Sequence, residues 1–333
     1  MVHAIPVAAA LRRAWPGARI DWLVSAKHRE ILDLVTVVDR VIAVRDRRGA
    51  TEGTPILKAI GELRRSHYDV ALDLQGLVKS AMFARASGAR RVIGFGEGYV
   101  REPLARRFYT ETHHPGGQHT FDRQSAHHVI DLNLGVLQTL EIPAGAVEFP
   151  IAEVTSAVAV RVLEETRGHY AVLNPGAAWP NKRWPPSRLA ALAVALRQQH
   201  GLRSVVIWGP GEQALAEQTA AESAGAAIVS PPTTIPDLVA LARRARLVVS
   251  GDTGPTHIAA AVGAPIVGIY GPTRPERNGP WNPDDVTVSR AATCECHHLR
   301  RCRRETMCLL EIGVDEVVAA ATRRLASAES GRG

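Results

Sequence analysis

The sequence has few aromatic residues and no long apolar run, and each shortage argues against a class of protein. Phe, Trp and Tyr together make up only 5% of the 333 residues. Proteins that bind single-stranded nucleic acid usually stack the bases on aromatic rings, so this composition argues against that function. No apolar stretch is long enough to cross a bilayer, and no signal peptide precedes the first expected helix. We therefore expect a soluble cytoplasmic protein.

Cysteine is also scarce, and its copies are confined to one short segment. They are Cys294, Cys296, Cys302 and Cys308. Disulfides are disfavoured in a cytoplasmic protein, so one interpretation of the cluster is a structural site for zinc or iron. The C-x-C spacing differs from the usual C-x-x-C knuckle, however. The pattern therefore leaves a metal site and a metal-free segment equally open.

Basic residues outnumber acidic ones along the chain. Lys and Arg total 40 and Asp and Glu total 33, so the formal net charge is +7. This excess favours an anionic partner, such as nucleic acid, an anionic membrane surface or a phosphorylated substrate. A proteome rich in arginine would produce the same excess, so charge alone does not choose among these partners.

Alternating strand and helix patterns predict an α/β protein with parallel sheets. The apolar segment 170–176 is typical of a strand, and a helix is expected over 187–201, with Ser187 as its N-cap and Gly201 near its end. The alternation continues through the second half, which indicates a Rossmann-like sheet. The first half repeats it and closes with a long helical segment over about 119–140.

A short segment between the two halves marks the expected domain boundary. Residues 141–151 contain Pro and Gly and differ in composition from the segments on either side. We therefore expect one domain over residues 1–145 and a second over residues 150–333.

The segment SGDTGPTHIAAAVGAPIVGIYGPT, residues 250–273, joins an expected strand to a short Ala-rich helix. Gly251 and Gly254 allow a tight turn and the close approach of an anion, and Pro255 suits the first helical turn. The free N–H groups and the helix dipole at that end favour a phosphate. Asp252 is negative, so sugar hydroxyls suit it better than phosphate. A capped helix without any ligand explains the pattern equally well.

Two more turns follow expected strands of the same half. In NPGAAWPNKRWPP, residues 174–186, a cation at Lys182 or Arg183 would neutralise a leaving diphosphate. In WGPGE, residues 208–212, Glu212 would bind ribose hydroxyls. The alternatives are a surface loop over packed Trp side chains and an ordinary acidic residue at a helix N-terminus. Turns that share one edge of a sheet indicate a ligand site more strongly together than singly.

Basic segments of the first half also follow expected strands. They are VRDRRG with Arg45, Arg47 and Arg48, DLQGLVKSA with Gln75 and Lys79, and VREPLARRFY with Arg101. If they face one cleft, these side chains would bind an anionic acceptor. Each segment taken alone is typical of a solvated surface.

Together these segments resemble glycosyltransferase family 9, the lipopolysaccharide heptosyltransferases, and are most similar to heptosyltransferase I. The resemblance rests on DTGPTHIAAAVGAPIVGIYGPT, NPGAAWPNKRWPP, DLQGLVKSA and REPLARRFY, and it covers nearly the whole chain. Asp-Thr-Gly-x-x-His followed by Gly-Pro-Thr is a specific combination.

The resemblance implies a GT-B fold, in which two Rossmann-like domains face each other across a cleft. It also implies an inverting transfer of heptose from ADP-heptose to a Kdo residue of lipid A, with no metal or other cofactor required. The second domain would hold the donor and the first would hold the acceptor. The protein would work in the cytoplasm, in peripheral contact with the inner membrane, and would bind no nucleic acid.

The resemblance also assigns roles to individual residues. Lys182 matches the lysine that contacts the donor diphosphate, and Glu212 matches the acidic residue at the adenosine ribose. Further donor-site residues are expected to be Asp252, Thr253, Gly254 and His257, and we expect Lys182 and Asp252 to act in catalysis. The expected acceptor-binding residues are Arg45, Arg47, Arg48, Gln75, Lys79 and Arg101.

The chain departs from the family pattern in two places. Ala177 and Ala178 stand where some relatives carry hydroxyl residues that touch phosphate. Family members open with a strand and a turn whose Asp is the expected general base, and Met1 stands just after that position. We therefore expect this chain to bind the ADP-heptose donor more effectively than it catalyses transfer of the heptose. The alternatives are a heptosyltransferase that modifies autotransporter-type proteins, and a non-catalytic protein that binds an ADP-sugar.

Overall fold

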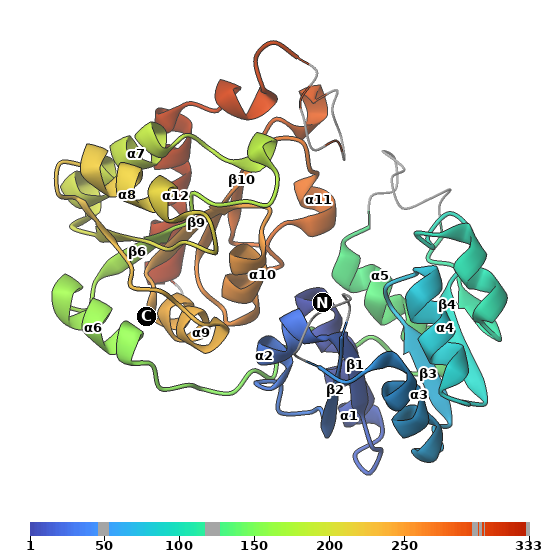
Figure 1. The fold of residues 1–333 in the computed structure, drawn as a ribbon. Helices are drawn as coiled ribbons and strands as arrows, with labels where there is room; N and C mark the ends of the chain where they lie inside the picture. The colour runs from blue at the N-terminus through green and yellow to red at the C-terminus, as the bar shows by residue number, and fades with distance from the viewer. Residues whose placement is uncertain (46–52, 117–126, 295–298, 300–301, 303, 331–333) are drawn as a thin grey trace. The chain divides into compact units, whose positions relative to one another are not determined.

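The computed structural model describes residues 1–333 except 46–52, 117–126, 295–298, 300–301, 303 and 331–333. The described residues form two compact units, Met1–Ala152 and Glu153–Gly333, and each is an α/β structure with parallel strands (Figure 1). The expected α/β class is confirmed. No helix in the described part of the chain is long and apolar enough to cross a membrane.

The second unit is built on a six-stranded parallel sheet. Its strands are β6 (Tyr170–Leu173), β7 (Arg203–Val206), β8 (Ala227–Val229), β9 (Leu247–Gly251), β10 (Ile266–Tyr270) and β11 (Val286–Ser289). They lie in the order β8-β7-β6-β9-β10-β11, so the direction of winding reverses between β6 and β9. This is the strand order of the Rossmann fold, in which ligands bind beyond the carboxyl ends of the strands at the reversal.

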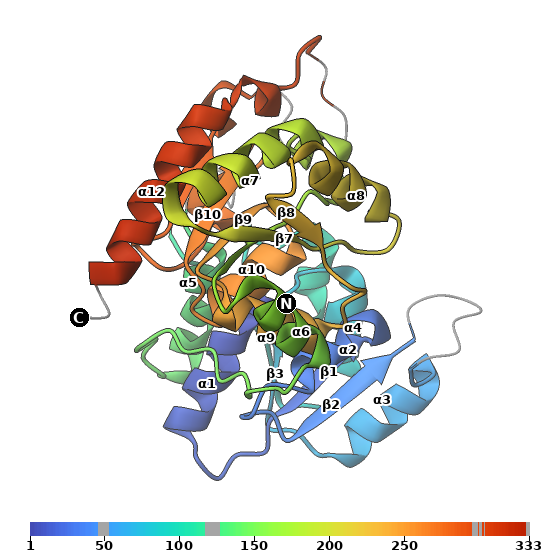
Figure 2. The same cartoon turned by 90° about the vertical axis from the view of Figure 1, so that its left-hand side faces the viewer.

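Helices cover both faces of this sheet, which is why its strands are short apolar runs. They are α6 (Ala157–Thr166), η5 (Pro180–Lys182), α7 (Pro186–His200), α8 (Gln213–Glu222), α9 (Ile235–Arg244), α10 (Gly254–Ala261), α11 (Pro275–Asn278), η6 (Ala291–Thr293), η7 (Cys308–Glu311) and α12 (Val314–Ser330). Figure 2 shows α7, α8 and α12 along one face, whereas α9 and α10 pack together against the other. The core on the first face includes Leu192 of α7, Val206 of β7 and Val317 of α12.

The first unit contains two separate parallel sheets in its described residues. One pairs β1 (Asp21–Ser25) with β2 (Arg40–Val44), and the other has the order β3 (Val70–Asp73), β4 (Arg91–Phe95), β5 (Glu111–His113). Its helices are η1 (Val2–Ala4), α1 (Ile5–Ala14), η2 (Ala26–His28), α2 (Arg29–Leu32), α3 (Ile56–Arg65), α4 (Val78–Ala86), η3 (Pro103–Phe108), α5 (Val129–Gly135) and η4 (Val136–Leu140).

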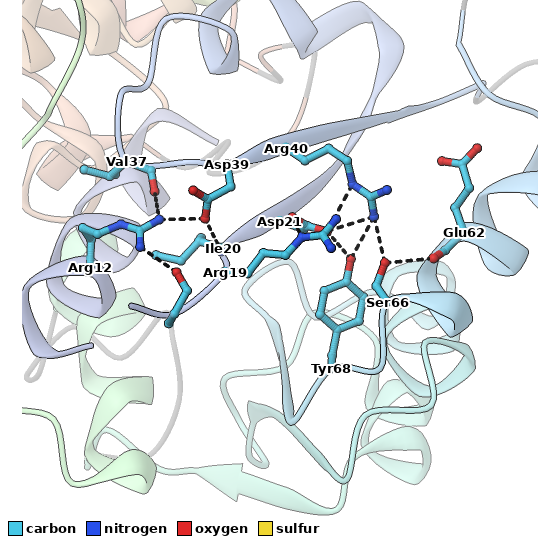
Figure 3. Close-up of polar contacts among 11 residues, drawn as sticks. Arg12, Arg19, Ile20, Asp21, Val37, Asp39, Arg40, Glu62, Ser66 and Tyr68 are labelled. Carbon is cyan, nitrogen blue, oxygen red and sulfur yellow. Dashed lines mark hydrogen bonds and ion pairs between the residues drawn. The ribbon is translucent and has the colours of Figure 1, made fainter. Parts of the chain in front are cut away.

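A buried carboxylate at the amino end of β1 links the two sheets (Figure 3). Asp21 accepts hydrogen bonds from Tyr68, just before β3, at 2.5 Å and from Arg40 of β2 at 3.1 Å. It also pairs with Arg19 at 3.1 Å, and the Arg40 guanidinium donates to Ser66 at 3.0 Å. Buried charge is tolerated where its hydrogen bonds are met in this way. The network therefore holds together the amino ends of β1, β2 and β3. It takes no part at the carboxyl ends of these strands.

Two helix boundaries differ from the sequence prediction. Helix α7 begins at Pro186, and its N-cap is Pro185 rather than Ser187, because proline already has the φ that the first helical turn needs. Gly201 ends this helix with φ 65°, as expected. The long helix expected over 119–140 begins only at Val129, because His128 is extended and caps it by accepting from the Ile130 amide. Residues 117–126 lie outside the described part of the chain.

Candidate functional site

Three loops meet at the carboxyl edge of the second sheet, beside the reversal of strand order. They follow β6, β9 and β7, which are neighbours in the sheet. These loops are the three strand-end turns singled out in the sequence. Sheet order therefore brings together segments that are far apart along the chain.

The central contact of the site is an ion pair between Lys182 and Asp252. The Lys182 Nζ atom lies 2.6 Å from Asp252 Oδ2, and the His257 Nε2 atom lies 3.4 Å from Asp252 Oδ1. These three side chains are only 15%, 9% and 18% exposed, respectively. The Lys182 ammonium also lies 4.6 Å from the centre of the Trp179 ring, close enough for a cation–π contact.

Asp252 remains ionised in this setting. Burial by itself raises the pKa of Asp252, but the hydrogen bond from His257 and the positive charge of Lys182 outweigh it and hold the pKa well below its usual range. A carboxylate with so low a pKa is a poor proton acceptor near neutral pH. Its geometry suits it instead to orient Lys182 and His257.

A hydroxyl and amide network that was not predicted from the sequence holds the turns together. Asn174 Nδ2 donates to Ser250 Oγ and to Thr253 Oγ1, both at 3.0 Å, and Thr256 Oγ1 donates to Ser250 Oγ at 2.7 Å. Thr253 is the N-cap of α10, but its side chain makes no cap hydrogen bond. The hydroxyl of Thr253 thus connects the β6 and β9 loops and leaves the first N–H groups of α10 without a side-chain cap.

The two glycines of the β9 turn play different steric parts. A Cβ atom on Gly251 would lie 3.2 Å from the Lys182 carbonyl oxygen, so this glycine allows close approach of the Lys182 loop. A Cβ atom on Gly254 would meet nothing within 4 Å. Neither residue has a positive φ. A side chain at 251 would therefore crowd the Lys182 carbonyl, whereas at 254 the glycine leaves open space at the N-terminus of α10.

Glu212 joins the β7 loop to the β6 loop. Its carboxylate accepts a hydrogen bond from the Gly209 amide at 3.2 Å and lies 3.7 Å from the Arg183 guanidinium. A Cβ atom on Gly176 would lie only 2.0 Å from Glu212 Oε2, so the carboxylate rests directly over this glycine. Arg183 in turn donates to the Ala177 carbonyl at 2.8 Å. Glu212 is therefore fixed at the same edge as Lys182.

In the first unit, a buried aspartate organises the loop that carries Gln75 and Lys79. Asp73 is 3% exposed, and its Oδ1 atom accepts from the amides of Gln75 at 2.9 Å and Gly76 at 3.2 Å. Its Oδ2 atom accepts from Ser80 Oγ at 2.9 Å and Tyr109 Oη at 2.7 Å. Burial and the nearby carboxylate raise the pKa of Tyr109, which therefore stays a hydrogen-bond donor.

The segment that carries Arg101 packs directly against this loop. Gly76 has φ +69°, and a Cβ atom there would lie 3.0 Å from the Arg101 amide nitrogen. The Glu102 amide donates to the Gly76 carbonyl at 2.9 Å, and the Glu102 carboxylate accepts from the Val78 amide at 2.7 Å. Hydrogen bonds to the backbone therefore hold these two segments against each other, while the side chains of Lys79 and Arg101 stay exposed.

The acceptor candidates of the first unit are spread over several segments and do not form one paired cluster like Lys182 and Asp252. The side chains of Gln75, Lys79 and Arg101 are exposed. Arg45 is half-buried and donates to the Gly53 carbonyl at 3.3 Å. Arg47 and Arg48 lie outside the described residues. The roles of Asp73 and Tyr109 were not predicted from the sequence. The signal that the sequence offers is Gly94, because a glycine inside a strand often marks the close approach of another group. Here that group is the Tyr109 ring, which would lie 2.3 Å from a Cβ atom on Gly94.

Three of the four cysteines lie in the described part of the chain, and they pack together. Cys294 and Cys308 are buried and pack with Cys302 in a small cluster, and Cys296 lies outside the described residues. Among the residues that the structure describes, no three or more His, Cys, Asp or Glu side chains are grouped so that they could hold a metal ion. The zinc or iron site considered from the sequence therefore has no support in the structure.

Comparison with known proteins agrees with this architecture. The family model described as glycosyltransferase family 9 (heptosyltransferase) matches residues 56–307. Lipopolysaccharide heptosyltransferase 1 of Pseudomonas aeruginosa is 30% identical over 307 residues, which cover 88% of this chain and 81% of that protein. The Escherichia coli K12 protein of the same name is 31% identical over 300 residues, covering 87% and 90%.

Solved structures place the same fold beside a nucleotide sugar. The solved structure of E. coli heptosyltransferase WaaC with ADP-2-deoxy-2-fluoro heptose matches with a TM-score of 0.69 and 27% identity, covering 95% of this chain and 93% of that one. This likeness, over two α/β units with parallel strands, defines a glycosyltransferase of the GT-B class. More narrowly, the chain belongs to glycosyltransferase family 9, the heptosyltransferases.

Proposed function

We propose that this enzyme transfers heptose from ADP-heptose to a Kdo residue of lipid A, with inversion at the anomeric carbon. The second unit would hold the donor and the first unit the acceptor. The observation that carries the proposal is the Lys182–Asp252 pair beside the reversal of the second sheet. The names of the relatives favour a lipopolysaccharide acceptor over a protein acceptor and over a non-catalytic role.

In the proposed donor complex, the diphosphate lies between the Lys182 ammonium and the N-terminus of α10. Both groups attract negative charge, and the open space at Gly254 admits the ligand to the backbone. The Asp252 carboxylate keeps Lys182 oriented at 2.6 Å, which reduces reorganisation during the reaction. Glu212, held by the Gly209 amide, would accept hydrogen bonds from the ribose hydroxyls.

The proposed reaction is a direct displacement. The acceptor hydroxyl oxygen forms a bond to the anomeric carbon from the face opposite ADP, while the bond from that carbon to the diphosphate oxygen breaks. The bonding electron pair leaves with ADP, and a general base takes the acceptor proton. Lys182 and the α10 N-terminus stabilise the charge that grows on the diphosphate. The low pKa of Asp252 argues that Asp252 is not the base.

The acceptor is anionic, and the first unit offers exposed cations to it. Lys79 and Arg101 extend from two backbone segments that Asp73, Gly76 and Glu102 hold together. Gln75 adds a neutral hydrogen-bonding group beside them. We include Arg45 as a further candidate, on the loop that follows β2.

Thermal unfolding with and without ADP-heptose tests the donor assignment, with UDP-sugars as controls. Ligand present at about one hundred times its dissociation constant stabilises the folded state by about 2.7 kcal/mol, so a clear rise in melting temperature is expected with ADP-heptose alone. Mass spectrometry of a Kdo-bearing acceptor then tests transfer. Equal shifts with ADP-heptose and UDP-sugars, or none, would overturn the assignment.

A further inference from the structure

The large apolar side chains that are exposed to solvent gather on one helical layer of the first unit. Half of the eight such residues in the described part of the chain lie there. They are Ile56 (45% exposed) and Leu57 (84%) on α3, Met82 (52%) on α4 and Leu104 (50%) on η3. Helices α3 and α4, both labelled in Figure 1, pack beside each other, and α4 also packs beside η3. The exposed apolar residues therefore belong to one continuous layer.

These side chains are not needed for the packing of the layer. The inward faces of the same elements are already filled, by Ala59 and Leu63 of α3, Phe83 of α4 and Ala105 of η3. Single exposed apolar residues are ordinary on protein surfaces, but a group of them on adjoining elements indicates an interaction site.

Cations lie on the same elements as the apolar residues. Lys79, Met82 and Arg85 recur every three residues and are all exposed, so they share the outer face of α4. Lys58 follows Leu57 on α3, and Arg107 follows Leu104 by one turn of η3, both also exposed.

Two of the acidic residues near these cations are already engaged, and α3 itself carries one more, Glu62. The Glu102 carboxylate accepts a hydrogen bond from the Val78 amide at 2.7 Å, and Glu97 pairs with Arg106 at 3.0 Å. The layer therefore combines protruding apolar side chains with an excess of positive charge. It is complementary to a surface that is anionic outside and apolar beneath.

We propose that this outer face, defined by Ile56, Leu57, Lys58, Met82, Leu104 and Arg107, docks on the surface of an anionic lipid bilayer. The inference rests on the proposed function, in which the neighbouring Lys79 and Arg101 bind the anionic part of a lipid acceptor. An acceptor anchored in the bilayer would be presented beside the surface on which the enzyme rests. Apolar side chains would enter the headgroup region while the cations pair with lipid phosphates.

Vesicle co-sedimentation of the full chain tests the proposal. Wild type is expected to bind vesicles of phosphatidylcholine with phosphatidylglycerol and to bind pure phosphatidylcholine much more weakly. The variant Leu57→Gln/Leu104→Gln should bind the anionic vesicles roughly tenfold less, because two apolar side chains no longer leave water. Lys58→Glu/Arg107→Glu should lose binding by about fivefold or more for each cation replaced.

The matched control is Val160→Gln, at a 49% exposed apolar position on α6 of the second unit, which should bind vesicles as wild type does. The Leu57→Gln/Leu104→Gln variant should keep wild-type transfer to a water-soluble Kdo acceptor and lose transfer to the same acceptor in vesicles. Wild-type vesicle binding by that variant, or no anionic preference in wild type, would overturn the proposal. Vesicle binding without selective stabilisation by ADP-heptose would uphold the surface and instead overturn the proposed function.

Discussion

The central charged side chains of the candidate donor site, Lys182 and Asp252, are paired and nearly buried, whereas Lys79 and Arg101 of the candidate acceptor site are exposed. In the second unit, Lys182 and Asp252 meet at 2.6 Å with 15% and 9% of their side chains accessible. In the first unit, the Lys79 and Arg101 side chains lie in solvent, and hydrogen bonds hold only the backbones of their segments.

The difference follows from what each proposed ligand demands. A leaving diphosphate gains charge during the reaction, and charges that are fixed in a poorly hydrated site stabilise it most effectively. An anionic glycolipid needs to be held but does not gain charge, so long cationic side chains on a firm backbone suffice. The second unit therefore fixes the charges themselves, and the first unit fixes only the segments that carry them.

Removing the fixed charge of the second unit gives the largest expected effect. Lys182→Ala should lower the rate of transfer by about 10²–10³, the usual result of deleting a preorganised group at a developing charge. Steady-state kinetics with a water-soluble acceptor measures it. Lys58→Ala removes an exposed lysine of the first unit and should leave that rate unchanged. If Lys182→Ala retained full activity, the contrast between the units would have no basis.

Removing the buried scaffold of the first unit should mainly change stability. Asp73→Ala leaves two amides and two hydroxyls without their acceptor and should lower the free energy of unfolding by about 2–4 kcal/mol. Denaturant unfolding measures this loss, and titration of ADP-heptose should show unchanged affinity. Asp69→Ala is the control, since that side chain is 85% exposed and should be neutral. Weakened donor binding in Asp73→Ala would contradict the proposal that the second unit alone binds the donor.

Acid should weaken the second site through Asp252. The folded-state pKa of Asp252 is lowered, so the ionised group contributes stability above its ordinary value of 3.8 and loses that contribution as the pH falls below it. Between about pH 5 and about pH 3, wild type should lose more stability than Asp252→Asn, which carries no titrating carboxyl. Thermal unfolding across this range gives the two slopes. Parallel slopes would contradict a paired, ionised Asp252.

The smallest expected effect concerns the position of Glu212. Gly176→Ala places a methyl group where the Glu212 carboxylate rests and should push that flexible side chain aside. We expect a loss of donor affinity of a fewfold, with a change in stability of about 1 kcal/mol or less. Calorimetric titration measures the affinity, with Gly17→Ala, where a Cβ meets nothing within 4 Å, as the control. Unchanged affinity would argue against Glu212 as a ribose ligand.

Local patterns in the sequence were enough to predict the α/β class, the strand-end turns and Gly201 at the end of α7. These features depend on side-chain periodicity and on backbone preferences within a few residues. Local patterns also identified Lys182, Asp252 and His257 as separate candidates for the donor site. Helix starts were less predictable, because prolines replaced Ser187 in capping α7.

Only the tertiary structure decided which of these residues meet. Lys182 and Asp252 are 70 positions apart, and they touch because β6 and β9 are neighbours at the reversal of the sheet. Tyr109 reaches Asp73 across 36 positions because β3 and β4 pair and Gly94 leaves room for the ring. A charged residue in a loop has the same local pattern whether it is solvated or paired, and strand order alone determines its partner.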